Sequence, residues 1–193
     1  MKKSNIIIIA VIAVIAIWMY SNYNGLVTAE ENVEESWSEV STQYQRRMDL
    51  IPKLAKIVAG YAKHEKEALE AVVNARSKAT QITIDPSNCT PEQLASFQKA
   101  QGEISSALSR LMAIQENYPE LKANKGFEDM QVQLEGTENR ISVARNNFNK
   151  TAQEFNTKIR KFPTNILASL FGFEKKNYFA AEAGAEKAPD FEF

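Results

Sequence analysis

The sequence is poor in helix-breaking residues and in the side chains that most often carry chemistry. Its 193 residues include seven glycines and six prolines, most of them outside the segments with helical periodicity. Few turns and long helices follow, so the sequence predicts an all-α fold. Cys89 is the only cysteine, which excludes an intrachain disulfide bond and leaves the redox compartment undetermined.

Neither sign of charge dominates the chain. It has 23 Lys and Arg residues against 24 Asp and Glu residues, and its formal net charge at pH 7 is −1. A protein that binds nucleic acid usually presents a strongly basic surface, and this balance supplies no such field. We therefore expect no nucleic-acid partner.

The motifs of common enzyme classes are also missing. His64, the only histidine, opens "HEKEA", where a zinc-protease helix would need a second histidine at the position of Ala68. A di-iron helix bundle needs a Glu-x-x-His motif on each of two helices, and Tyr61 occupies the glutamate position before His64. The sequence contains no glycine-rich phosphate-binding loop. We therefore predict no catalytic residue, no metal site and no cofactor.

One long apolar run is present, close to the N-terminus. The stretch "IIIIAVIAVIAIWMY", Ile6–Tyr20, has no charge and no helix breaker. A helix of this length covers about 22 Å of a hydrocarbon core that is about 30 Å thick, so a membrane span must also include flanking residues. We predict a membrane anchor over residues 1–25, in contact with the lipid bilayer through Ile6, Ile9, Val11, Ile15, Trp18 and Tyr20.

A cleaved signal peptide is the alternative for this run, because two lysines followed by an apolar stretch are typical of one. Bulky Trp18, Tyr20 and Tyr23 occupy the region where a cleavage site needs small residues, and they suit the aromatic belt of a membrane surface. We therefore favour an uncleaved, single-pass anchor. Lysines precede the run and glutamates follow it, which predicts a cytoplasmic N-terminus with the rest of the chain extracytoplasmic.

The stretch "RRMDLIP", residues 46–52, places a proline inside a helical pattern. Apolar residues recur at alternating steps of four and three from Val33 onward, and this rhythm crosses Pro52 without a change of phase. We therefore predict one helix over residues 28–80 that is kinked at Pro52, with Asp49 placed to cap the amide groups that the kink frees. Two shorter helices that meet at Asp49 are the alternative.

Arg47 and Glu65 interrupt the apolar stripe of this helix. Long charged side chains commonly pack their stems against a core while their heads reach water, and we expect the same of both residues. A buried ion pair is the alternative.

Two further long helices follow a loop at residues 80–89. Thr90, Pro91 and Gln93 have the order expected of an N-cap, a first helical residue and the far side of a capping box, and the helix that they open runs to Tyr118. The next helix extends over residues 126–162 and ends before a proline.

These helices predict an antiparallel bundle over residues 26–173. Each helix has one apolar stripe and the connections are short, so packing three long helices together buries all three stripes; the count becomes four if the first helix breaks at Pro52. We expect the aromatic side chains on these stripes to fill one seam and to leave no sizeable pocket: Trp37, Tyr44, Phe97, Phe127, Phe148 and Phe155.

A short amphipathic helix is predicted within residues 164–173, followed by a loosely structured tail at 174–193. Its apolar cluster has three possible uses: to fold back on the bundle, to lie in the lipid interface, or to dock on a second subunit or a partner. We predict that the cluster contributes to a contact between copies or with a partner protein. Its residues are Ile166, Leu167, Leu170, Phe171 and Phe173.

Three blocks of the sequence resemble the LemA family of bacterial membrane proteins. They are "YNGLV", "RRMDLIPKLAKIVAGYAKHEKEALEAVVNAR" and "ENRISVARNNFNKTAQEFNTKIRKFP", and the order of segments around them also resembles the family. The resemblance is weakest over residues 80–125. It implies a bacterial inner-membrane protein with an N-terminal anchor, a bundle of long helices and no established enzymatic activity.

Two functions of different classes are compatible with these features. The first is a non-enzymatic, membrane-anchored scaffold or interaction module, whose bundle binds other proteins or copies of itself and organises a membrane complex. The second is a ligand-binding accessory or sensor-type extracytoplasmic module. A sensor normally has a second membrane span and a cytoplasmic output domain, and the sequence shows neither, so we favour the scaffold.

Overall fold

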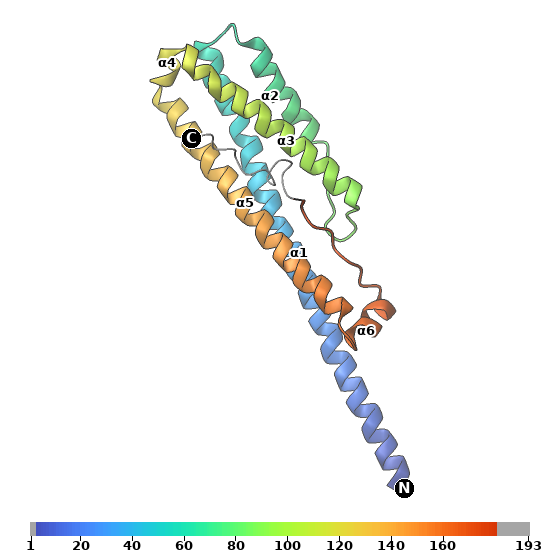
Figure 1. Cartoon of the computed structure of the whole chain (residues 1–193). Helices are drawn as coiled ribbons and strands as arrows, with labels where there is room; N and C mark the ends of the chain where they lie inside the picture. Colours follow the sequence, from blue (N-terminus) through green and yellow to red (C-terminus); the bar gives the residue numbers. More distant parts are fainter. Residues whose placement is uncertain (1–2, 181–193) are drawn as a thin grey trace, which may run out of the picture.

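The computed structural model describes residues 3–180, and over this range the chain is helical without any strand (Figure 1). This confirms the predicted all-α fold. The elements are α1 (Lys3–Tyr61), α2 (Lys66–Ala79), α3 (Pro91–Ala113), the 3-10 helix η1 (Ile114–Asn117), α4 (Pro119–Lys122), α5 (Lys125–Arg160) and α6 (Thr164–Phe171).

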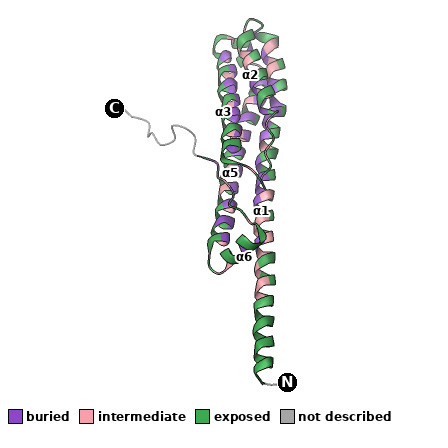
Figure 2. Cartoon of the chain, turned by 90° about the vertical axis from the view of Figure 1, so that its right-hand side faces the viewer, coloured by how far each residue is buried: buried purple, intermediate pink, exposed green. Residues whose placement is uncertain are grey.

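Helix α1 carries both the predicted anchor and the first helix of the bundle. Its 59 residues form one unbroken helix of about 88 Å, and it crosses residue 25, where we expected the anchor to end. Figure 2 shows the N-terminal part of α1 exposed and alone, while its C-terminal part is buried among the other helices. The predicted anchor and the bundle are therefore joined by one continuous helix rather than by a linker.

The bundle has four helices, because the chain reverses after Tyr61. Residues Ala62–Glu65 form a turn, so the prediction of one helix over residues 28–80 is wrong, as is the alternative break near Pro52, which lies inside α1. The apolar rhythm continues across the turn because Val58 and Val72, on either side of it, are buried in the same core cluster. Periodicity alone therefore could not locate the reversal.

The four long helices α1, α2, α3 and α5 alternate in direction (Figure 1). Helix α1 makes its most extensive contacts with α5, and α2 with α3. Thr90 begins α3 as predicted: its Oγ1 accepts a hydrogen bond from the Gln93 amide at 3.2 Å, and the Gln93 side chain accepts one from the Thr90 amide at 2.9 Å. Asn124 caps α5 by accepting from the Phe127 amide at 3.0 Å.

The core consists of two apolar clusters rather than one seam. The six predicted aromatic residues are all buried, but Phe127 belongs to the cluster at the α2 and α4 end, whereas Trp37, Phe97 and Phe148 lie in the cluster nearer the anchor. Rings in the second cluster contact each other, with the Trp37 and Phe148 centroids 5.4 Å apart. Between the two clusters, buried Arg47 and Gln101 form a polar layer.

The first part of the C-terminal tail is ordered against the bundle, contrary to our prediction. Residues 174–180 run along the surface of α5, where Asn156 and Asn149 bond the backbone of Lys176 and Phe179. Lys176 is 6% exposed, and its Nζ atom lies 2.6 Å from Glu30 Oε1. Phe179 is buried and stacks on Trp37 at 5.7 Å. The rest of the predicted tail, residues 181–193, lies outside the described residues.

Candidate functional site

The predicted anchor residues lie on the isolated part of α1. Most of them are exposed: Ile6, Ile9, Val11, Ile15 and Tyr20. Trp18 is half-buried and packs against the cluster nearer the anchor, so it contacts the bundle as well as the anchor surface. Among the described residues, α1 is the one helix long and apolar enough to cross a membrane, and none of its apolar window is buried. The exposed side chains are those that a lipid bilayer would cover.

Helix α6 lies beside the end of the predicted anchor. The ring of Phe171 is 4.8 Å from that of Tyr23, and Thr164 Oγ1 lies 3.4 Å from Asn22 Oδ1. In the same region Lys158 donates a hydrogen bond from Nζ to the carbonyl oxygen of Gly25. A Cβ atom on Gly25 would lie 3.0 Å from this Nζ, so the glycine permits the close approach.

The structure divides the predicted interaction cluster between the bundle and the outside. Leu167 is buried and Phe173 partly buried against the cluster nearer the anchor, which is the fold-back arrangement. Ile166 and Leu170 are 59% and 67% exposed, and Phe171 remains exposed beside Tyr23. Sequence analysis missed Phe162, which is 82% exposed just before α6, because we predicted one helix over residues 126–162, whereas α5 ends at Arg160.

The groups around Pro52 differ from the predicted cap. Asp49 Oδ1 accepts a hydrogen bond from Gln45 Nε2 at 2.9 Å. The backbone group that Pro52 frees is the carbonyl of Met48, and it accepts a hydrogen bond from Arg76 Nε at 3.0 Å. A side chain of α2 thus satisfies the backbone of α1. The bend itself stays a prediction.

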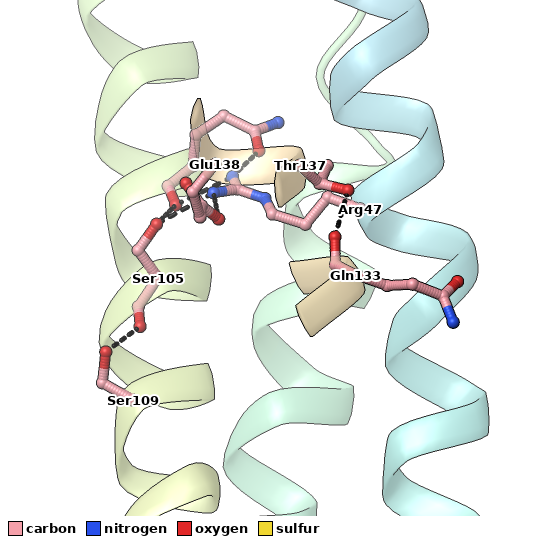
Figure 3. Close-up of polar contacts among 7 residues, drawn as sticks. Arg47, Ser105, Ser109, Gln133, Thr137 and Glu138 are labelled. Atoms are coloured by element: carbon pink, nitrogen blue, oxygen red, sulfur yellow. Dashed lines mark hydrogen bonds and ion pairs between the residues drawn. The ribbon is translucent and has the colours of Figure 1, made fainter. Parts of the chain in front are cut away.

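Arg47 is the centre of the polar layer in the core (Figure 3). It is 1% exposed, and its guanidinium donates to Ser105 Oγ at 2.8 Å, to Glu138 Oε1 at 2.7 Å and to the Gln101 side chain. It also lies over the Tyr44 ring, 5.1 Å from the centroid. The charged end of Arg47 is therefore buried in an ion pair, which was the alternative, and does not reach water as we expected.

The partners of Arg47 come from α3 and α5, so one side chain of α1 joins three helices. Glu138 keeps 44% of its side chain exposed, which lets its second oxygen meet water. Arg47 Nε has no hydrogen-bond partner among the described residues. The other interrupting charge, Glu65, accepts a hydrogen bond from the Tyr118 hydroxyl at 3.0 Å near the turn after α1.

A polar cleft of about 580 Å³ opens beside this layer, between α3 and α5. Arg47, Ser105 and Glu138 contribute to its wall, and Ala180 of the tail lies at one side of it. The Ala180 carbonyl accepts hydrogen bonds from Gln98 and Arg145, at 3.2 and 3.0 Å. The prediction of an apolar core without a sizeable pocket is therefore wrong at this level of the bundle, where polar side chains interrupt the packing.

Other titratable groups lie at the edges of the fold. Burial raises the pKa of the Cys89 thiol, which makes it a weaker nucleophile than a free thiol. The hydrogen bond to Glu65 raises the pKa of Tyr118, and the Ser87 amide lowers the pKa of Asp85. Within residues 3–180, no group of three His, Cys, Asp or Glu side chains could hold a metal ion.

The sequence pattern of the LemA family matches residues 36–193. The chain belongs to the LemA family. This confirms the resemblance to the family: the match includes the second and third quoted blocks, and it also covers residues 80–125, where the resemblance was weakest and where α3 lies.

Proteins similar to this chain include magnetosome proteins. Magnetosome protein MamQ 1 of Paramagnetospirillum magneticum is 28% identical over 193 aligned residues, which cover 90% of this chain and 71% of that protein. Magnetosome protein MamQ of Magnetospirillum gryphiswaldense is 29% identical over 174 residues, 81% of this chain and 64% of its own length. Protein LemA of Metamycoplasma hominis is 29% identical over 145 residues, 75% of this chain and 63% of that protein.

Proposed function

We propose that this LemA-family chain is a non-enzymatic, membrane-anchored scaffold that holds protein partners or copies of itself close to the bacterial inner membrane. In this proposal residues 1–25 anchor the chain with its N-terminus in the cytoplasm. The bundle of residues 26–173 and the tail of residues 174–193 are extracytoplasmic in this proposal.

The continuity of α1 is the observation that carries this proposal. A flexible linker would let a tethered domain sample many distances and orientations, whereas one helix of 59 residues fixes the bundle to its anchor. Two contacts reinforce the base of the bundle: Lys158 bonds the Gly25 carbonyl, and Lys176 pairs with Glu30. A fixed platform suits a protein whose task is to hold partners at a membrane.

The relatives support a membrane-associated role. Two of the three relatives described above are named magnetosome proteins, and none of the three names denotes an enzyme. In the polar layer the hydroxyl of Ser105, the amide of Gln101 and the carboxylate of Glu138 each accept a hydrogen bond from the Arg47 guanidinium. This set is suited to holding helices together.

Photo-crosslinking in native membranes tests the scaffold. A photoreactive amino acid at Val132 or Val143, two exposed apolar positions of α5, should give adducts with defined proteins or with a second copy of the chain. The same amino acid at Ile12, on the anchor, is the control for contacts that reflect lipid and nonspecific neighbours. A bundle that gives no adduct from any exposed helix, in a protein that is monomeric in mild detergent, would contradict the scaffold.

The cleft beside Arg47 favours the second function, a ligand-binding accessory or sensor-type module. Its wall is rich in hydrogen-bonding side chains and reaches the buried guanidinium. Native mass spectrometry of the protein extracted from its own membranes should show a retained small molecule if this function holds. An Arg47→Met variant with normal helical content should lose that molecule, while Arg140→Met, on the same helix as Glu138, should retain it.

A further inference from the structure

The level at which α6 sits along α1 coincides with one boundary of the predicted membrane span. From Lys3 to Asn22, α1 covers about 29 Å at about 1.5 Å per residue, which equals the thickness of a hydrocarbon core of about 30 Å. Asn22 lies next to Thr164, and Tyr23 lies next to Phe171. When the apolar part of α1 spans the bilayer, α6 therefore lies at the surface of that bilayer.

The exposed apolar side chains of this region face away from the bundle. Leu167 and Ala168 are buried against it, whereas Ile166 and Leu170, one helical turn apart, share a different face of α6 and are exposed. Phe162 is exposed in the turn that connects α5 to α6. Figure 2 shows this turn and α6 at the end of the bundle from which α1 continues alone. The apolar face is thus next to the anchor.

Basic side chains accompany this face. Arg160, the last residue of α5, and Lys161, its C-cap, directly precede Phe162, and both are exposed. Lys175 follows α6 and is also exposed, with Glu174 as its acidic neighbour. Lys176, the other lysine of this stretch, is paired with Glu30 and does not contribute. The exposed charge next to the apolar face is therefore mainly positive, which suits the phosphate groups of lipids.

We propose that α6 and the preceding turn form a second membrane contact, in which Phe162, Ile166 and Leu170 insert into the lipid interface beside the anchor. The apolar run of α1 is short, and this contact places additional apolar side chains at the level of Asn22, where α1 becomes polar. The inference rests on the insertion of α1 that the proposed function includes, but not on the scaffold role. Tethering by α1 holds the short helix α6 at the bilayer, so α6 needs little affinity of its own.

A second copy of the chain is the other occupant that this face could take. A face that binds a second copy of the bundle would be expected to point into the aqueous space between bundles. The contacts of α6 with Asn22 and Tyr23 instead hold it at the level of the bilayer surface, where lipid is the solvent that surrounds the anchor on all sides. The position of α6 therefore favours lipid over a partner subunit.

Environment-sensitive labels in vesicles test the contact. The full chain carrying Cys89→Ser receives one new cysteine at a time, labelled with the fluorophore NBD and reconstituted into vesicles of phosphatidylcholine and phosphatidylglycerol. Labels at Ile166→Cys and Leu170→Cys should show blue-shifted emission, and brominated lipids should remove most of that emission. Asn165→Cys and Ser169→Cys, on the polar side of the same helix, should be quenched less, and Val143→Cys in the bundle should not be quenched.

Each other outcome would overturn the inference in a recognisable way. Labels at Ile166→Cys and Leu170→Cys that emit like Val143→Cys would show that water covers the face. Blue-shifted labels that brominated lipids do not quench, and that shift back on dilution of the protein in lipid, would show that a second copy covers it. A label at Ile12→Cys reports on the anchor: without quenching there, α1 is not inserted, and the proposed anchor fails together with the lipid contact. Quenching only at Ile12→Cys would overturn the inference and leave the anchor intact.

Discussion

Arg76 Nε lies 3.0 Å from the carbonyl oxygen of Met48, and this oxygen is the one that Pro52 leaves without its helical partner. A proline inside a helix has no amide hydrogen for the carbonyl four residues earlier. Met48 is buried, so its carbonyl would otherwise remain unsatisfied in the core. The proline in "RRMDLIP" thus creates an acceptor on α1, and α2 docks against it.

This relationship predicts coupling between Pro52 and Arg76. Arg76→Met keeps most of the side-chain stem but removes the donor, and we expect it to cost about 1 to 3 kcal/mol of unfolding free energy because a buried carbonyl loses its partner. Pro52→Ala alone should change stability little or raise it, since the restored amide can bond Met48. In the Pro52→Ala background, Arg76→Met should cost clearly less than in the natural sequence.

Urea unfolding of the four proteins in mild detergent, followed by circular dichroism, measures this coupling. The matched control is Lys78→Met, an exposed charge on the same helix, which should cost the same in both backgrounds. Equal costs of Arg76→Met with and without Pro52 would show that the hydrogen bond does not depend on the proline. A loss of several kcal/mol from Pro52→Ala alone would show that the natural fold requires the ring itself.

The polar layer predicts unequal effects of its two charged members. Arg47→Ala should cost about 3 kcal/mol or more, because it removes the hydrogen-bond donors for Gln101 and Ser105 and opens a cavity between three helices. Glu138→Gln should cost about 1 kcal/mol or less, since Glu138 is 44% exposed and Arg47 keeps its other partners. The measurement is the free energy of unfolding. Equal, large losses would show that the ion pair, rather than the hydrogen-bonded layer, supports the bundle.

The sequence predicted those parts of the fold that depend on local chemistry. The capping box at Thr90 and the apolar faces follow from nearby residues, and the structure contains them. The predicted end at Tyr118 is wrong, because α3 ends at Ala113 and the 3-10 helix η1 occupies Ile114–Asn117. The reversal after Tyr61 depends instead on which surfaces pack together. Since α1 and α2 bury the same core, the apolar rhythm has no defect there, and only Gly60 weakens the helix locally.

The polar contacts that organise the candidate sites were beyond sequence analysis for a related reason. Arg47, Arg76 and Asn156 resemble solvated positions of a helix, and their partners lie on other elements. Arg47 did give a signal, because it interrupts an otherwise apolar stripe. Asn156 gave none, since an asparagine beside an apolar face is common on helices. Its role emerges only when the tail is placed along α5.

The ordered tail depends on a match of spacings between α5 and residues 174–180. Asn149 and Asn156 are about 10.5 Å apart along the helix, and Lys176 and Phe179 are about 10 Å apart in an extended chain. Asn156 exchanges two hydrogen bonds of 2.8 Å with the backbone of Lys176, and Asn149 bonds both backbone groups of Phe179 at 2.8 and 3.0 Å. Two asparagines thus hold the tail as a neighbouring strand would.

Asn156→Ala should therefore release the tail without unfolding the bundle. We expect a local loss of about 1 to 3 kcal/mol, because two buried backbone groups of Lys176 lose their partners. Hydrogen exchange should show the amide of Lys176 losing protection while amides of α3 keep theirs. Asn147→Ala, an exposed asparagine on the same helix that bonds Glu39, is the control and should leave the exchange of Lys176 unchanged. Unchanged protection in Asn156→Ala would contradict the spacing argument.

The burial of Phe148 predicts how much the cluster nearer the anchor contributes to the free energy of unfolding. Its ring is buried and makes edge contacts with both Trp37 and Phe179, whose centroids are each 5.4 Å away. Phe148→Ala should cost about 3 to 5 kcal/mol, as truncation of a buried aromatic side chain typically does. Val143→Ala, an exposed position on the same helix, should stay within about 0.5 kcal/mol of the natural protein. A small loss for Phe148→Ala in urea unfolding would show that the tail and helices readily collapse into the space.

The anchor predicts how the intact protein behaves in cells. Because the apolar part of α1 is exposed and continuous with the bundle, the chain should sediment with the inner membrane and resist carbonate extraction. Protease added from the outer side of spheroplasts should digest the bundle, because Lys2 and Lys3 favour a cytoplasmic N-terminus. Ile9→Asp with Ile12→Asp should move the protein to the soluble fraction, whereas Val132→Asp with Val143→Asp should not.

Protection of the bundle from outer protease, with cleavage only after lysis, would reverse the predicted orientation while retaining the anchor. A mature N-terminus at Glu30 would instead identify the run as a cleaved signal peptide, and it would remove the part of α1 on which both the scaffold and the lipid contact of α6 depend.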